Sequence, residues 1–251
     1  MIFRQLFDPD SSTYTYLIGS PGMKEAVLID PVDGHLEDYL ELLRRLGLSL
    51  KYSIETHVHA DHITASGRLR QRTGAETAVS RLCGAMGADH QLTDAHVLGF
   101  AGGEEIKVLA TPGHTPGSSS FLWQDRVFTG DTLLINGCGR TDFQGGDPGA
   151  LYDSVTERLF ALPAETLVYP GHDYHGRRVS CIGQERAINP RLAGKTREQF
   201  IEIMQSLDLP KPRRIDEAVH GTACAACMRK RYARGDGAWR RRSGSRATIP
   251  G

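Results

Sequence analysis

The segment THVHADH, residues 56–62, constrains the fold more than any other part of the chain. It places three of the ten histidines and one aspartate within six consecutive positions, 57–62. Asp61 could instead cap a helix while the histidines serve only packing, and a lone histidine would favour that interpretation. Four potential ligands in six positions favour a metal site. One loop rarely supplies every ligand, so the fold must bring other loops to the same point.

Three further turns each carry a candidate ligand directly after a glycine. They are TPGHTPG with His114, FTGDTLL with Asp131, and YPGHDYHG with His172. Each ligand follows a predicted strand or turn, where a glycine lets the backbone bend sharply and aim the next side chain inward. Such turns are common singly. Together with the cluster they predict one centre assembled from several loops.

The pattern of apolar residues predicts strands and helices mixed in two successive blocks. The first block has strands at 2–6, 13–19, 25–30, 51–57 and 76–80, with helices at 35–46 and 63–74. A strand that ends at His57 would place His57 and His59 on one face. The second block has strands at 104–110, 118–123, 126–129 and 166–170, with helices near 148–161, 184–188 and 196–206. This order implies two sheets, or one folded sheet, with helices outside.

The combined ligand pattern resembles the metallo-β-lactamase superfamily over roughly residues 1–190. The resemblance implies an α+β fold, a four-layer αββα sandwich with the metal at one edge of the two packed sheets. We expect a catalytic domain over 1–219 and a basic tail over 220–251. The residues that carry the resemblance are His57, His59, Asp61 and His62, then Gly113-His114, Gly130-Asp131 and Gly171-His172.

Within this superfamily, the ligand pattern is compatible with two reactions. In its two-metal hydrolases the pattern implies one ion on His57, His59 and His114, another on Asp61, His62 and His172, and Asp131 as the bridge. Such a pair lowers the pKa of bound water toward about 7. Glyoxalase II, which hydrolyses a glutathione thioester, represents this alternative.

A second signature favours a different reaction. Residues 137–147, GCGRTDFQGGD, resemble the corresponding segment of persulfide dioxygenases, whereas glyoxalase II departs from it after the Gly-Cys-Gly-Arg start. This resemblance implies one Fe(II) per chain, held by His57, His114 and Asp131. Two imidazoles and one carboxylate suit Fe(II) and leave coordination positions open. The remaining candidates would orient these ligands by hydrogen bonds without binding the iron themselves: His59, Asp61, His62 and His172.

The same resemblance implies the substrates glutathione persulfide and O₂, and the products sulfite and glutathione. The carboxylates of the tripeptide need cationic or hydrogen-bonding partners, for which Arg140, Asp142 and Tyr174 are the candidates. A structural ion pair between Arg140 and Asp142 is the alternative use of that arginine. Relatives of this kind imply a homodimer or a higher homo-oligomer.

Composition and charge bear on location and partners. No run approaches the roughly 20 apolar residues of a membrane span, the N-terminus lacks a signal-peptide pattern, and the odd number of cysteines, five, favours reduced thiols. We therefore expect a cytoplasmic protein without membrane contact.

The C-terminal end is basic. Residues 228–251 carry eight basic side chains and one acidic, a net charge of +7, so the rest of the chain has a net charge of −7. Nucleic-acid binding through that tail is an alternative, but the acidic body argues against it. Cys138 could be modified by persulfide or sense oxidation, but a buried inert thiol is favoured, and Cys224 and Cys227 lack the second pair that would complete a zinc site.

Overall fold

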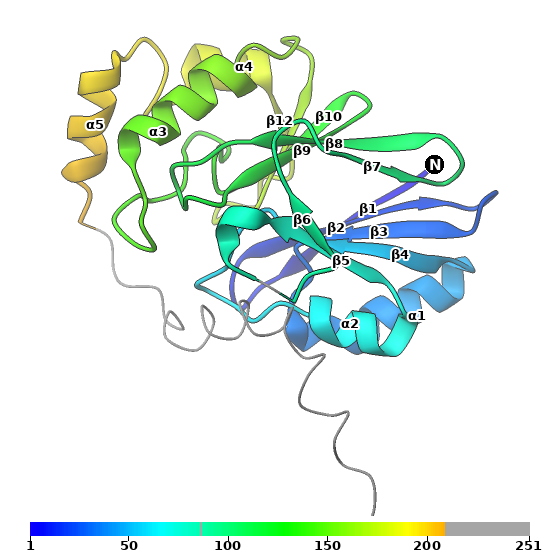
Figure 1. The fold of residues 1–251 in the computed structure, drawn as a ribbon. Helices are drawn as coiled ribbons and strands as arrows, with labels where there is room; N and C mark the ends of the chain where they lie inside the picture. Colours follow the sequence, from blue (N-terminus) through cyan, green and yellow to red (C-terminus); the bar gives the residue numbers. More distant parts are fainter. Residues whose placement is uncertain (86, 209–251) are drawn as a thin grey trace, which may run out of the picture.

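The computed structural model describes residues 1–85 and 87–208, which form two six-stranded sheets packed face to face with helices on both outer sides (Figure 1). The expected α+β sandwich of four layers, αββα, is therefore confirmed. Residues 220–251, with Cys224 and Cys227, lie outside the described residues, and the boundary at 219 stays a prediction. Within the described part, every helix is too short or too polar to span a bilayer.

The first sheet has the strand order β1-β2-β3-β4-β5-β6. Its first three strands pair antiparallel, as the predicted opening meander requires, and β3 through β6 pair parallel. Helices α1 and α2 make crossovers between the parallel strands, because parallel neighbours need such a connection. The elements are β1 (Ile2–Asp8), β2 (Thr13–Ser20), β3 (Glu25–Ile29), η1 (Asp33–His35), α1 (Leu36–Leu46), β4 (Ser49–Ile54), α2 (Ser66–Thr73), β5 (Glu76–Ser80), η2 (Arg81–Cys83) and β6 (His90–Leu92).

The second sheet has the order β12-β11-β10-β9-β8-β7. It is antiparallel except for the β10–β11 pair, which is parallel. Helices α3, α4 and α5 lie on its outer face (Figure 1). The elements are β7 (Val97–Phe100), β8 (Glu104–Ala110), β9 (Ser119–Trp123), β10 (Arg126–Gly130), α3 (Pro148–Asp153), η3 (Ser154–Leu159), β11 (Leu167–Pro170), β12 (Ser180–Cys181), α4 (Ile182–Ile188) and α5 (Arg197–Gln205).

An aromatic core fills the space between the sheets. Tyr16 of β2 packs against Phe128 of β10 with ring centroids 4.9 Å apart, and Phe121 and Trp123 of β9 are buried in the same cluster. Burying one large apolar side chain stabilises a fold by roughly 1.5–3 kcal/mol. Because these contacts cross from sheet to sheet, they fix the spacing of the loops at the sheet edges.

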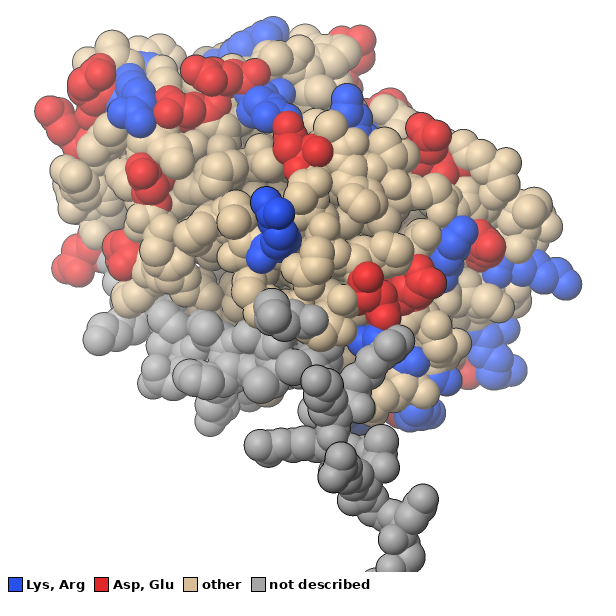
Figure 2. Space-filling view, in the orientation of Figure 1, with Lys and Arg blue, Asp and Glu red and all other residues tan. Residues whose placement is uncertain are grey.

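The helices cover the outer faces as amphipathic elements. In α1, Leu36, Tyr39 and Leu43 are buried at helical spacing, and Gly47 ends the helix with φ +64°, as the sequence predicts. The exposed side of this layer carries paired charges, such as Arg72 with Glu37 at 2.7 Å. Figure 2 shows basic and acidic side chains interspersed over one face of the molecule. Exposed pairs of this kind contribute about 0–1 kcal/mol each.

Two of the predicted boundaries are wrong. The strand before the histidine cluster ends at Ile54, so His57 and His59 lie in the following loop and do not share a strand face. The next helix begins at Ser66 instead of residue 63. Strands β6, β7 and β12 were not predicted, because two to four residues are too few to show a period of two.

The loops that carry the candidate ligands leave the sheets at one edge. Strands β8 and β10 both pair antiparallel with β9, so they run in the same direction, and β11 runs parallel to β10. Their carboxyl ends therefore meet at one edge of the second sheet. The carboxyl ends of β3 and β4 meet likewise in the first sheet. The backbone N–H of Tyr14, in β2, donates a 2.8 Å hydrogen bond to the carbonyl of Gly171, which follows β11. This bond joins the edges of the two sheets.

Candidate metal centre

Three side chains from three loops meet at the edge where the two sheets adjoin. His57 follows β4, His114 follows β8 and Asp131 follows β10; one potential ligand atom of each lies within 4.8 Å of the others. Nε2 of His114 lies 3.6 Å from Oδ2 of Asp131. Two ligands about 2.1 Å from one ion stand roughly 3–3.5 Å apart, so this spacing is close to that of a shared metal. The structure brings the three residues together, and their role as ligands stays a prediction.

Hydrogen bonds set both imidazoles in the tautomer that a metal requires. The Thr56 hydroxyl donates to Asp30 at 2.7 Å, so it must accept from Nδ1 of His57 at 2.9 Å. Nδ1 of His114 donates to the carbonyl of Arg140 at 2.7 Å. When each ring is neutral, its lone pair is therefore on Nε2. Burial, and then the neighbouring histidines, hold the pKa of His57 well below its usual range, which keeps the ring neutral.

The carboxylate completes a donor set that fits a metal ion. Oδ1 of Asp131 is buried and has no hydrogen-bond partner among the described residues. An unsatisfied carboxylate oxygen in the interior is costly unless a cation takes its charge. Two imidazole nitrogens and one unsatisfied carboxylate oxygen are a donor set that a divalent transition metal binds. This centre is a metal-binding His/Asp site.

Glycines make the close approach of these loops possible. Gly113 has φ +136°, and a Cβ there would meet the backbone of Leu151 at 2.3 Å. Gly130 has φ +49°, and a Cβ would meet Oγ1 of Thr56 at 2.5 Å. The predicted sharp bends before His114 and Asp131 are therefore confirmed. Gly171 differs, because its φ is not positive; a Cβ there would lie 2.7 Å from Oδ1 of Asp131.

A second group of potential ligands adjoins the first. His59, Asp61 and His62 offer atoms within 4.8 Å of one another. Nε2 of His172 lies 3.5 Å from Oδ1 of Asp131 and 3.7 Å from Oδ2 of Asp61. Nδ1 of His59 and Nε2 of His62 are buried without a hydrogen-bond partner in the described part of the chain. The geometry places these four residues beside the centre, and whether they bind metal or only orient ligands stays open.

Two buried carboxylates that the sequence analysis missed, Asp30 and Glu55, contact the histidine cluster. Nε2 of His59 lies 3.3 Å from Asp30 and 3.1 Å from Glu55. Burial lowers the pKa of His59, but the two carboxylates outweigh it and raise that pKa well above its usual range. Asp30 also accepts from the backbone N–H of Thr56 at 2.7 Å. The signal in the sequence was an acidic residue at the end of each of two apolar strands, EAVLID and KYSIE.

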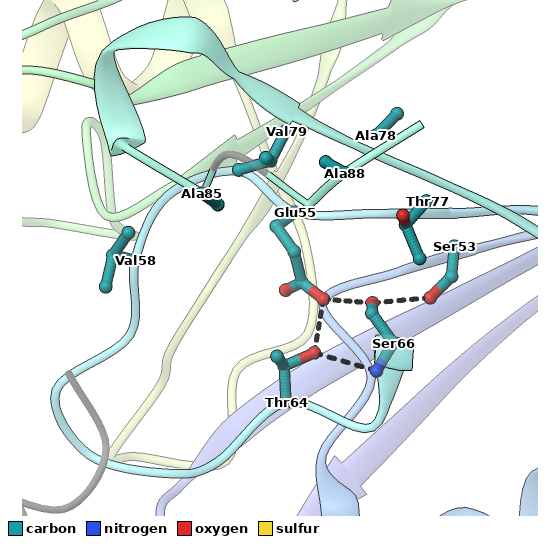
Figure 3. Close-up of a pocket in the computed structure, with 10 residues that line it drawn as sticks. All are labelled: Ser53, Glu55, Val58, Thr64, Ser66, Thr77, Ala78, Val79, Ala85 and Ala88. Carbon is teal, nitrogen blue, oxygen red and sulfur yellow. Dashed lines mark hydrogen bonds between the residues drawn. The ribbon is translucent and has the colours of Figure 1, made fainter. Parts of the chain in front are cut away.

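Glu55 anchors a small polar network beside the centre (Figure 3). Its Oε1 accepts short hydrogen bonds from the hydroxyls of Thr64 and Ser66, and Ser66 shares a further one with Ser53 at 2.6 Å. Glu55 lines a pocket whose walls combine these hydroxyl groups with small apolar side chains, among them Ala78. The network ties the loop after the histidine cluster to β4.

Residues 137–147 form a segment that contacts all three ligand loops, and we call it the strap. The N–H of Gly139 donates to the carbonyl of Asp131 at 2.7 Å, and the carbonyl of Arg140 accepts from His114. The side chain of Gln144 donates to the carbonyl of Val58 at 3.2 Å. These bonds reach the loops of Asp131, His114 and His57 respectively. The strap contains the dioxygenase-like signature of the sequence.

The three candidate substrate residues differ in environment. Arg140 forms a bidentate pair with Asp142 at 2.7 and 2.6 Å, so the ion pair considered from the sequence is present. Its guanidinium also lies 4.3 Å from the ring centroid of Phe143. Tyr174 is 68% exposed and stacks on His172, with ring centroids 6.1 Å apart. Tyr174 is therefore an accessible group beside His172, and Arg140 is a cation held by a more exposed carboxylate.

Comparisons with known proteins agree with the geometry. The model of the metallo-beta-lactamase superfamily matches residues 8–172. The proteins named "Persulfide dioxygenase ETHE1, mitochondrial" from Homo sapiens and Bos taurus are each 49% identical over 222 residues, which cover 87% of this chain and 86% of theirs. The crystal structure of ETHE1 from Myxococcus xanthus is 55% identical, with a TM-score of 0.87 over 90% of this chain and 99% of that one.

Proposed function

Because the chain belongs to the persulfide dioxygenase family of the metallo-beta-lactamase superfamily, we propose that it oxidises glutathione persulfide with O₂. One persulfide, one O₂ and one water give sulfite, glutathione and two protons. The outer sulfur loses four electrons, which O₂ accepts, and the S–S bond is broken. Sulfite receives three oxygen atoms, two from O₂ and one from water.

The observation that carries the proposal is that His57, His114 and Asp131 lie together. Nδ1 of each histidine is hydrogen-bonded, and Oδ1 of Asp131 is without a hydrogen-bond partner among the described residues. We propose that these three residues hold one iron(II) ion per chain. When bound, iron(II) would supply a redox-active centre with open positions at which a persulfide sulfur and O₂ can meet. The chain's own contribution is to fix the three ligands and to hold the two reactants next to each other.

Arg140, Asp142 and Tyr174 are the proposed contacts to the glutathione part of the substrate. The Arg140 guanidinium suits a carboxylate of the tripeptide, which would take the place that Asp142 occupies in the free protein. Asp142 is then released toward the tripeptide amine. The largely exposed Tyr174 stacks on His172, and its hydroxyl can donate to the same substrate. These contacts hold the persulfide sulfur toward the centre.

The residues of the second group are proposed to orient the ligands without binding the iron. Thr13 supports this role, because its hydroxyl donates to Asp61 at 3.0 Å and lies 3.4 Å from Nδ1 of both His62 and His172. A hydrogen-bonded frame of this kind holds each ring at a fixed angle. Thr13 thereby connects Asp61, His62 and His172.

A glyoxalase-II-like hydrolase with two metals is the second candidate. The observation in its favour is the second group of ligand atoms, His59, Asp61 and His62, beside the first. Relatives named persulfide dioxygenase are 49% identical over 87% of this chain, which favours the first candidate. The two proposals differ in metal count and in oxygen consumption.

The test is an oxygen electrode combined with sulfite detection. Iron-loaded protein should consume one O₂ and release one sulfite per glutathione persulfide. His114→Ala should lose both iron and oxygen uptake, because water cannot replace one of three protein ligands. Hydrolysis of a glutathione thioester without oxygen uptake would overturn the proposal in favour of the second candidate.

We also propose a cytoplasmic location and a homodimer or higher homo-oligomer. The described cysteines Cys83, Cys138 and Cys181 are free thiols, which suits a reducing compartment. Light scattering on the purified chain tests the oligomer, and a monomer at working concentration would contradict it.

A further inference from the structure

The backbone of the strap's first four residues, 137–140, contacts two of the three proposed ligands. The Arg140 carbonyl accepts from Nδ1 of His114 at 2.7 Å and so fixes the angle and tautomer of that ring. The Gly139 N–H donates to the carbonyl of Asp131 at 2.7 Å. Gly139 packs tightly against both ligand residues, because a Cβ on it would lie 2.4 Å from the Asp131 carbonyl oxygen and 2.9 Å from Nδ1 of His114. A small displacement of this backbone would therefore move both ligands.

The segment that follows α4 holds this backbone in place from the far side. The amide of Asn189 donates to the carbonyl of Gly137 at 3.0 Å, and the guanidinium of Arg191 donates to the carbonyl of Cys138 at 2.8 Å. Asn189 is fully buried. Its Oδ1 accepts from the N–H of Arg191 at 3.1 Å, so the two anchoring residues are themselves joined.

A buried carboxylate completes the anchor. Glu185 of α4 is fully buried and accepts from the Asn189 amide and from the backbone N–H of Asn136, each at 2.9 Å. Asn136 immediately precedes the strap and has φ +57°, a conformation that favours a short polar side chain. The path from helix α4 to the His114 ring thus consists of consecutive hydrogen bonds and a short length of backbone.

We propose that Asn189 and Arg191 are positioning residues of the metal centre, acting on His114 and Asp131 through the carbonyls of Gly137 and Cys138. The inference rests on the proposed function only in its assignment of His114 and Asp131 as ligands. Neither anchoring residue contacts a ligand side chain. Their effect is to hold the acceptor and donor groups that orient the ligands, and loss of such support typically costs 10–100-fold in metal affinity.

Helix α4 offers a matched control in Arg186. It is exposed, and its guanidinium donates to the backbone carbonyl of Phe160 at 3.1 Å. Arg186→Ala and Arg191→Ala therefore each delete one arginine-to-carbonyl hydrogen bond, but only Arg191 bonds to the strap. A purely structural role would make the two variants alike at the metal.

The experiment measures iron release from the loaded full-length protein to an excess of an iron(II) chelator, followed by absorbance. Arg191→Ala should release iron at least tenfold faster than the wild type, and Arg186→Ala at the wild-type rate. Arg191→Lys, which can still donate to the Cys138 carbonyl, should recover part of the loss. Asn189→Ala is the second variant, and Asn189→Asp, which keeps the shape but loses the donor, should resemble it.

Thermal unfolding of the iron-free proteins separates positioning from folding. Equal release rates for Arg191→Ala and Arg186→Ala would overturn the inference, as would release that follows the unfolding midpoint across all variants. A wild-type protein that takes up no iron would overturn the metal centre itself, and this inference with it. A wild type that holds iron but oxidises no persulfide would overturn the proposed reaction and leave the release test valid.

Discussion

Nε2 of His114 and Oδ2 of Asp131 lie 3.6 Å apart, beyond hydrogen-bond distance and close to the separation of two ligands on one ion. Their loops leave the carboxyl ends of β8 and β10, which run in the same direction on either side of β9. The sheet topology therefore supplies the proximity. The glycines, the strap and the buried Asp30 supply the orientation.

Gly171→Ala should weaken the metal centre by displacing the carboxylate of Asp131. Alanine needs no left-handed backbone there, but the new Cβ would lie 2.7 Å from Oδ1 of Asp131 and 3.1 Å from the backbone carbonyl carbon of Gly130. We expect iron affinity to fall at least tenfold in a competition titration. Gly137→Ala is the control, since a Cβ at Gly137 meets nothing within 4 Å. Equal iron affinity in both variants would contradict the assignment of Asp131.

Gln144 combines a hydrogen bond with an unfavourable backbone conformation. Its side chain bonds to the Val58 carbonyl, and its φ is +51°. Gln144→Ala and Gln144→Gly both delete the bond, but only glycine adopts this φ freely. We expect both variants to lose oxygen-uptake activity to a similar extent, with Gln144→Gly the more stable by about 1 kcal/mol in thermal unfolding. Wild-type activity in both would show that the bond does not position the His57 loop.

Glu55→Gln should destabilise the fold. Both oxygens of the Glu55 carboxylate accept hydrogen bonds, from Thr64, Ser66 and His59. A glutamine amide has only one acceptor oxygen, and its NH₂ group would face one of these donors. A buried donor left without an acceptor costs about 1–3 kcal/mol, which urea unfolding can measure. Glu105→Gln, at an exposed position of β8, serves as the control and should stay within about 0.5 kcal/mol of the wild type. A Glu55 variant as stable as that control would contradict the network.

His35 should make stability depend on pH. The hydrogen bond to Asp38 raises its pKa, burial opposes this, and Asp8 adds to the increase. A raised folded-state pKa means that the stabilisation is complete below the ordinary value of 6.5 and disappears as pH rises through the raised value. The wild type should therefore exceed His35→Gln in unfolding free energy by more at about pH 6 than at about pH 8.5. A difference that grows toward alkaline pH would contradict this sign.

Much of the fold could be predicted from local sequence patterns. The leucine spacing in α1 and the stop at Gly47 predicted that helix, and the alternating β-rich segments predicted the opening meander. The short strand β12 could not be predicted, because its two residues are defined by pairing with β11 and carry no period of their own. The end of β4 was misplaced because Glu55 and Thr56 continue a strand-like pattern while their backbone already turns toward Asp30.

The candidate site divides in the same way. Histidines and aspartates after glycines are visible in a sequence, so the residues that meet at the centre could be named in advance. The hydrogen bonds that hold these residues in place could not be predicted. They are made to the backbone carbonyls of Arg140 and Val58, and every residue has such a carbonyl. Asp30 is separated from Thr56 by 26 positions, and only the parallel pairing of β3 and β4 reveals that they touch.

The central claim is that His57, His114 and Asp131 hold one metal ion, and metal analysis of the purified wild type and of Asp131→Asn tests it most directly. The wild type should contain one iron per chain, and Asp131→Asn, which keeps the shape but removes the charge, should contain almost none. Asp153→Asn, on the surface beside Arg197, should match the wild type. Two metal ions per wild-type chain, or full iron in Asp131→Asn, would contradict the account.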